Sequence, residues 1–182
     1  MPKVLIPLAV GFEEIEAVTI ADILKRAGVE VELVALENLD VVGAHGIVIK
    51  AQTHIKDIKA DDFDMVVLPG GLPGATNLAE SEDVKALLNT FAQSKKYIGA
   101  ICAAPLALKE AGVLRNAYTC YPSFEKKIQA DGYTSDKDIV CDENIITSKG
   151  PATAMSFALF LVEKLIGVDA SNRLKKELLF SN

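Results

Sequence analysis

The chain has 182 residues, of which 50% are hydrophobic and 24% are charged, and its 25 Asp and Glu against 19 Lys and Arg give a formal net charge of −6. This composition is typical of a globular chain of domain size, so it excludes intrinsic disorder and argues against nucleic-acid binding. Three Cys and two His, with no Cys-x-x-Cys pair, exclude a zinc ribbon and a disulfide framework.

The two most apolar segments do not suit a membrane or a secretory signal. The run at 4–10 is short and leads directly into a charged cluster, unlike a signal peptide. Together with the odd number of thiols, this predicts a reducing, cytoplasmic location. The segment 152–166 is shorter than the roughly 20 residues of a membrane crossing, and it contains Glu163 and Lys164. We interpret it as a core or interface helix.

Short apolar runs alternate with helical patterns along the chain. In chain order the expected elements are a strand at 4–10, a helix at 14–27, a strand at 29–36, a strand at 65–68, a helix at 82–95, a strand at 97–101, a helix at 103–111, a strand at 117–121, a helix at 123–130, a strand at 144–147 and helices at 151–166 and 171–180. Residues 47–49 and 53–58 interrupt the alternation and predict a short hairpin.

Alternating strands and helices predict an α/β fold in three layers, with helices on both faces of a mostly parallel sheet. The run Met65 to Leu68 is apolar throughout, which is typical of a strand covered on both faces. No repeat or linker divides the sequence, so residues 1–182 are expected to form a single domain. Functional sites of such sheets lie beyond the carboxyl ends of the strands.

Cys102 lies where a predicted strand passes into a predicted helix of small residues. This is the layout of a nucleophile elbow, in which a tight turn raises the reactive side chain above the sheet. A helix N-terminus beneath the sulfur would favour the thiolate, which is the reactive form of cysteine. The alternative is an inert, buried cysteine in a tight turn.

Three carboxylates, Glu13, Glu14 and Glu16, follow the first predicted strand. We interpret Glu13 and Glu14 as solvated partners of the helix dipole. Glu16 instead shares a helix face with the apolar residues four and seven positions later, so it is expected to be partly buried with a raised pKa. A protonated Glu16 could donate a hydrogen bond to a Cys102 thiolate, and the two groups would then titrate as a coupled pair.

Two other strand ends carry candidate site residues. Gly70 and Gly71 follow the strand at 65–68 and would let backbone N–H groups approach an oxyanion, although a plain turn explains them equally well. Tyr121 either lends its hydroxyl to a substrate or fills the rim of the site with its ring. Cys120 and Cys141 are expected to pack in the core.

The two histidines, His45 and His54, lie between the second predicted strand and Asp62. A thiol nucleophile commonly takes a histidine as its base. His54 is interpreted as a solvated loop residue, and His45 would reach a reactive site only from the partner subunit of a dimer. This placement argues against a cysteine peptidase or an amidotransferase, which need a histidine beside Cys102.

Four segments together resemble the ThiJ/PfpI superfamily and, within it, the Parkinson disease protein 7 family. They are Gly11-Phe12-Glu13-Glu14-Ile15-Glu16, Val67-Leu68-Pro69-Gly70-Gly71, Ala100-Ile101-Cys102-Ala103-Ala104-Pro105 and Ser148-Lys149-Gly150-Pro151-Ala152-Thr153. The resemblance covers nearly the whole chain and implies a flavodoxin-like domain that forms a homodimer. It also implies Cys102 as the reactive thiol and Glu16 as its hydrogen-bonding partner.

The resemblance further implies that backbone amides of Gly70, Gly71 and Ala103 line the site. Several members of the family carry His where this sequence has Tyr121. The implied activity needs no cofactor or metal: a cysteine-dependent glyoxalase acting on methylglyoxal-like 2-oxoaldehydes, or a deglycase acting on their early adducts with proteins, in carbonyl and oxidative stress.

A redox-sensing, chaperone-like protein whose Cys102 is oxidised to sulfinic acid is the alternative. A relative of cysteine peptidases or amidotransferases is a lesser one. The expected partners are a small reactive aldehyde or a glycated substrate and a second copy of the chain, with neither nucleic acid nor membrane.

Overall fold

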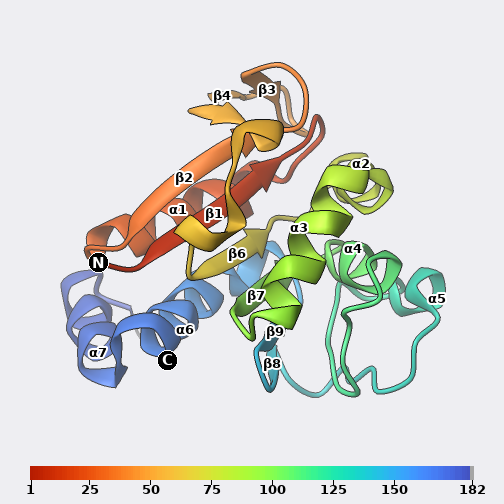
Figure 1. The fold of residues 1–182 in the computed structure, drawn as a ribbon. Coiled ribbons are helices and arrows are strands. Elements are labelled where there is room, and N and C mark those ends of the chain that lie inside the picture. Colours follow the sequence, from red (N-terminus) through yellow and green to blue (C-terminus); the bar gives the residue numbers. More distant parts are fainter. Residues whose placement is uncertain (181–182) are drawn as a thin grey trace.

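The computed structural model describes residues 1–180, and these form a seven-stranded sheet between two layers of helices (Figure 1). The strand order is β5-β2-β1-β6-β7-β9-β8, and neighbouring strands are parallel except for the antiparallel pair β8 and β9. The predicted three-layer α/β fold with a mostly parallel sheet is therefore confirmed. No helix in the described residues combines the length and the apolar character that a membrane crossing requires.

The strands of this sheet are β1 (Lys3–Leu8), β2 (Glu30–Ala35), β5 (Thr53–His54), β6 (Met65–Leu68), β7 (Tyr97–Ile101), β8 (Ile139–Asp142) and β9 (Ile145–Ser148). A separate antiparallel pair consists of β3 (Asp40–Val42) and β4 (Val48–Lys50). The α-helices are α1 (Glu14–Arg26), α2 (Gly74–Glu80), α3 (Glu82–Gln93), α4 (Pro105–Glu110), α5 (Glu125–Ile128), α6 (Ala154–Ile166) and α7 (Val168–Glu177), and 3₁₀ turns lie at Ile55–Asp57, Ala60–Asp62 and Pro151–Thr153.

The hydrophobic core has two parts, one on each face of the sheet. Helices α1, α6 and α7 cover one face, and α2, α3 and α4 cover the other (Figure 1). The strand β6 contributes to both, because successive side chains of a strand point to opposite faces: Met65 and Val67 face the first group of helices, and Val66 and Leu68 face the second. All four side chains are fully buried, as their continuous apolar run predicts.

The region between β2 and β6 differs from the predicted hairpin. Residues 48–50 pair with 40–42 rather than with 53–58, and Thr53–His54 instead joins the edge of the main sheet, parallel to β2. We refer to β3, β4 and the turn between them, residues 40–50, as the β3–β4 hairpin. This hairpin stands beside the start of α1 (Figure 1).

The strand predicted at 117–121 is absent from the described residues. The N–H groups of Ala117 and Thr119 donate to the side chains of Asp142 and Thr147, each at 2.9 Å, so they do not form a strand ladder. The helix predicted at 123–130 is reduced to α5, and α2, β3 and β8 are not among the predicted elements. Each missed element has only three to seven residues, which is too short for a clear periodic pattern.

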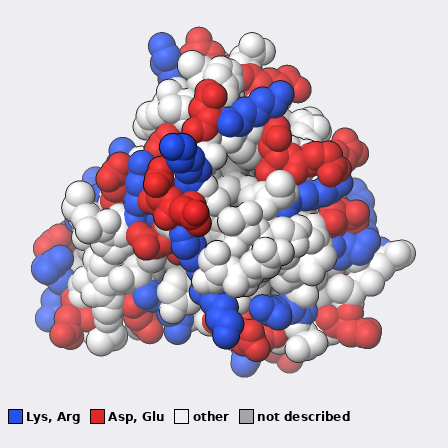
Figure 2. Space-filling model, in the orientation of Figure 1, with Lys and Arg blue, Asp and Glu red and all other residues white. Residues whose placement is uncertain are grey.

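Four neighbouring strands, β1, β6, β7 and β9, direct their carboxyl ends to one rim of the sheet. The four sequence segments singled out above follow these same strands. Parallel pairing thus brings residues from distant parts of the chain to a single place. Acidic and basic side chains are interspersed over the face shown in Figure 2, without a continuous basic patch there.

Candidate active site

Cys102 occupies a sharp turn directly after β7. Its backbone φ angle of 63° is in the left-handed region, which residues other than glycine rarely adopt. The turn is held on both sides, because Cys102 N–H donates to Ser148 O at 2.9 Å and Cys102 O accepts from Tyr121 N–H at 2.8 Å. The side chain is 8% exposed. This is the predicted nucleophile elbow, although the helix begins only at Pro105.

Glu16 is fully buried beside Cys102, on the face of α1 that the apolar periodicity predicts. Gly70 N–H donates to Glu16 Oε2 at 2.7 Å. The other carboxyl oxygen, Oε1, has no nitrogen or oxygen partner among the described residues, and the Cys102 thiol is the polar group next to this carboxyl. Burial raises the pKa of Glu16 to about 7, against the smaller, lowering effects of Gly70 and Cys102.

The Cys102 thiol and the Glu16 carboxyl influence each other. Burial and the negative charge of an ionised Glu16 raise the pKa of Cys102, whereas the backbone N–H groups of Gly71 and Ala103, which face the sulfur, lower it. The pair loses its first proton near pH 7, and because the pKa of the thiol is raised above that of the carboxyl, the remaining proton lies mainly on the sulfur. In the state in which this proton lies on Glu16, Cys102 is a thiolate, and the N–H groups of Gly71 and Ala103 and the Glu16 carboxyl stabilise it.

The two glycines after β6 have different tasks. A Cβ atom on Gly70 would lie 2.6 Å from Cys102 Cβ and 2.9 Å from Glu16 Oε2, so only glycine allows this close approach. The amide of Gly70 is committed to Glu16, which corrects the expectation that it faces the substrate. Gly71 has a φ of 90°, and its amide faces the sulfur.

Tyr121 lies at the rim of the site with 48% of its surface exposed. A Cβ atom on Gly150 would lie 3.2 Å from the Tyr121 ring and 4.0 Å from Cys102 Sγ, so Gly150 keeps the space between the ring and the thiol open. The segment 148–153 is one of the motifs in the sequence, but Gly150 is not among the predicted site residues. Thr153 holds this loop, since its hydroxyl donates to Gly150 O at 2.9 Å and lies 2.7 Å from Ser148 Oγ.

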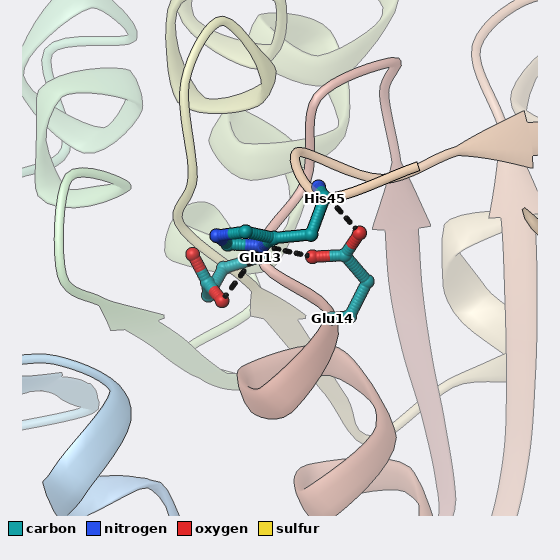
Figure 3. A group of neighbouring side chains, drawn as sticks. All are labelled: Glu13, Glu14 and His45. Carbon is teal, nitrogen blue, oxygen red and sulfur yellow. Dashed lines mark hydrogen bonds and ion pairs between the residues drawn. The ribbon is translucent and has the colours of Figure 1, made fainter. Parts of the chain in front are cut away.

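A cluster of Glu13, Glu14 and His45 lies at the start of α1 (Figure 3). Glu14 is 5% exposed and accepts hydrogen bonds from the N–H groups of His45, at 2.7 Å, and Ile47, at 3.4 Å. The interpretation of Glu14 as a solvated carboxylate is therefore wrong. His45 reaches these carboxylates from the β3–β4 hairpin of its own chain.

The geometry of this cluster is that of a hydrogen-bonded imidazole and carboxylate, which form an ion pair when His45 is protonated. His45 Nδ1 lies 2.8 Å from Glu14 Oε2 and 3.7 Å from Glu13 Oε1. A separation of 2.8 Å suits a shared proton and is shorter than the ~3.3 Å between two ligands of a tetrahedral ion with bonds of ~2.0 Å. We therefore treat the cluster as an ion pair and not as a metal site.

The other two cysteines lie in different surroundings. Cys120 is fully buried, as predicted, and burial raises its pKa to about 12. The prediction that Cys141 packs in the core is wrong, because Cys141 is exposed on β8. The strand lies at the edge of the sheet, where Val140 faces inward and Cys141 faces outward.

Comparisons with known proteins agree with this architecture. The Protein DJ-1 homolog B of Arabidopsis thaliana is 39% identical over 178 residues, which are 96% of this chain but 40% of that longer protein. The Glutathione-independent glyoxalase DJR-1.2 of Caenorhabditis elegans is 39% identical over 167 residues, covering 91% of this chain and 89% of that protein. The crystal structure of Drosophila melanogaster DJ-1beta matches with a TM-score of 0.95 and 38% identity, over 100% of this chain and 99% of that one.

The family model described as the DJ-1/PfpI family matches residues 2–164, which include all four strand ends of the site. The resemblance found in the sequence motifs is thereby confirmed. Since the motifs, the sheet topology and the relatives agree over nearly the whole chain, this protein belongs to the DJ-1/PfpI family.

Proposed function

We propose that this protein is a cysteine-dependent glyoxalase that converts methylglyoxal-like 2-oxoaldehydes to 2-hydroxy acids without a cofactor, and that it also acts on early adducts of these aldehydes with proteins. The observation that carries the proposal is the buried pair of Cys102 and Glu16 beneath the amides of Gly71 and Ala103. A relative named as a glutathione-independent glyoxalase, 39% identical over 91% of this chain, supports it.

In the first step, the Cys102 thiolate adds to the aldehyde carbon and forms a C–S bond. The aldehyde oxygen becomes negatively charged and takes the proton of the Glu16 carboxyl. The N–H groups of Gly71 and Ala103, which face the sulfur, would stabilise charge that develops beside it. The product of this step is a hemithioacetal next to an ionised Glu16.

In the second step, Glu16 removes the hydrogen of the former aldehyde carbon as a proton and returns it to the neighbouring carbon. The electron pair of the broken C–H bond forms an enediolate, whose negative charge lies on the former ketone oxygen. When the proton is returned to the neighbouring carbon, the hydroxyl proton of the hemithioacetal passes to that oxygen, so the ketone becomes an alcohol and the aldehyde carbon becomes a thioester. Water then cleaves the C–S bond, which releases the hydroxy acid and regenerates Cys102. One carbon is oxidised while its neighbour is reduced, so the reaction needs no external oxidant or reductant.

The test is to incubate the protein with methylglyoxal in the absence of glutathione and to follow both compounds by NMR. Lactate should accumulate in a one-to-one ratio to the methylglyoxal consumed. Consumption without lactate would show only adduct formation on the protein and would overturn the proposal.

The histidine positions do not support a peptidase or an amidotransferase. His45 is held by Glu13 and Glu14. His54 lies on β5, which is four strands away from β7, or ~19 Å at the usual strand spacing.

Redox sensing through Cys102 is a second candidate function, favoured by the amides of Gly71 and Ala103, which could hold the oxygens of a sulfinate. After mild peroxide treatment, we expect mass spectrometry to show two added oxygens on Cys102 before any on Cys141. Cys141 is a matched internal control, since it is the exposed thiol of the same chain. Equal or faster oxidation of Cys141 would count against the sensor.

The proposal includes a homodimer in a reducing, cytoplasmic setting. Apolar side chains are exposed on α1 and on the β3–β4 hairpin that contacts it, and a surface of this kind is typical of an interface. They are Ile15, Val18, Val42, Ile47 and Val48. We expect light scattering to give the mass of a dimer for the wild type and of a monomer for Ile47→Asp. A monomeric wild type at micromolar concentration would contradict the dimer.

A further inference from the structure

The β3–β4 hairpin is fastened to the start of α1 through Glu14. The carboxylate accepts hydrogen bonds from the backbone N–H groups of His45 and Ile47 and, when Nδ1 is protonated, from the His45 ring. Gly43 leaves room for this carboxylate, because a Cβ atom there would overlap the Glu14 side chain. Ala44 N–H adds a bond to Phe12 O at 2.8 Å. The turn between β3 and β4 is thus shaped around one buried carboxylate.

This cluster is joined to the reactive pair by a short series of contacts. Glu13 N–H donates to Gly70 O at 2.9 Å, and Gly70 N–H donates to Glu16 Oε2 at 2.7 Å. The charge of Glu13 also acts on Glu16 and raises its pKa. The charged state of the Glu13, Glu14 and His45 cluster is therefore felt at the pair of Glu16 and Cys102.

We propose that His45 is a positioning residue for the reactive site: as an imidazolium, it fastens the β3–β4 hairpin to α1 and offsets the negative charges of Glu13 and Glu14 beside Glu16. This inference rests on the proposed role of the Cys102 and Glu16 pair, but not on the identity of the aldehyde substrate. Figure 3 shows the imidazole ring between the two carboxylates. The role differs from that of a general base, since His45 acts through Glu13 and Glu14.

The direction of the pH dependence follows from the groups that face each other. The titratable groups around His45 are Glu14 and Glu13, and those around Glu16 are Cys102 and Glu13. The hydrogen bond to Glu14 and the charges of both carboxylates raise the pKa of His45. The imidazolium is therefore fully present below the ordinary histidine pKa of about 6.5, and it is lost as the pH rises through the raised value.

The first experiment follows alkylation of Cys102 by iodoacetamide against pH, with site-resolved mass spectrometry. His45→Gln should raise the apparent pKa of the pair and lower the rate at pH 7 by about two- to threefold, as expected for the loss of a unit charge that acts through a solvent-like medium. High salt should reduce the difference. At pH 9 the alkylation rates of the wild type and of His45→Gln should become equal. His54→Gln is the matched control and should behave as the wild type.

The second variant separates charge from shape. His45→Lys keeps a positive charge near both carboxylates and should restore the wild-type rate at pH 7. An unchanged rate in His45→Gln would overturn the proposal, and so would equal losses in His45→Gln and His45→Lys, because these would assign the effect to the shape of the turn. A loss of alkylation rate in His45→Gln that does not depend on the salt concentration would also overturn the proposal.

A third measurement does not depend on Cys102. Following the His45 ring by NMR, we expect its pKa to lie above the ordinary value in the wild type and to fall towards it in Glu14→Gln. No fall would overturn the ion pair. Normal alkylation without lactate formation would instead refute the proposed reaction and leave the role of His45 intact.

Discussion

Replacing Cys102 with Ser is expected to abolish lactate formation from methylglyoxal, with a loss of about a thousandfold or more in rate. The serine hydroxyl is a far weaker acid than the thiol, and Glu16, with a pKa of about 7, cannot remove its proton to a useful extent. The backbone turn and its bonds to Ser148 and Tyr121 do not involve the sulfur, so the fold should persist.

Two controls show whether a loss of activity is specific to the Cys102 thiol. Cys141→Ser changes an exposed thiol on β8 and should retain the wild-type rate. Circular dichroism and thermal unfolding of Cys102→Ser should match the wild type, so that lost turnover is not lost structure. A serine variant with more than a tenth of the wild-type rate would refute the role of Cys102 as the nucleophile.

Glu16→Gln is expected to lower the rate by about 10² to 10⁴, the usual contribution of a proton-transferring group. Gln has nearly the same shape and can still accept the N–H of Gly70, but it cannot carry a proton between the two substrate carbons. In the wild type, the rate should rise with pH through about 7, where the pair loses its first proton. That inflection should disappear in the variant, and a variant that keeps it would contradict our assignment.

The same substitution should change the pH dependence of stability. The pKa of Glu16 is raised from 4.5 to about 7 in the folded chain, so between these values the unfolded chain releases a proton that the folded chain retains. The free energy of unfolding therefore falls as the pH rises, by up to ~3 kcal/mol, and is constant above about pH 7. Denaturant unfolding should show Glu16→Gln gaining stability relative to the wild type at pH 8 but not at pH 4. If the two proteins differed in free energy of unfolding by the same amount at pH 4 and pH 8, a raised pKa of Glu16 would be excluded.

Local patterns predicted those parts of the structure that depend on near neighbours. The continuous apolar run of β6 and the elbow after β7 are readable because each is a short stretch with a single explanation. The burial of Glu16 follows from its place on the apolar face of α1. In each case the helix or strand period determines which way the side chain points.

The errors concern residues whose environment is built by distant parts of the chain. Glu14 looks like a solvated carboxylate until the β3–β4 hairpin, about 30 positions later, supplies its donors. Likewise, the segment at 117–121 has an alternating apolar pattern, but the N–H groups of Ala117 and Thr119 donate to the side chains of Asp142 and Thr147. Neither partner can be inferred from local sequence. The different roles of the Gly70 and Gly71 amides could not be predicted either, because their partners, Glu16 and Cys102, are distant in the sequence.

The hydrogen bond from Gly70 to Glu16 joins residues 54 positions apart, and the Cys102 turn depends on Ser148 of β9. The reactive thiol therefore exists only when β1, β6, β7 and β9 are assembled side by side. In a fragment, or during an opening that separates these strands, Cys102 returns to the behaviour of an ordinary cysteine. The labelling rate of this one sulfur therefore reports whether the four strands are assembled, because the site needs long-range contacts among them.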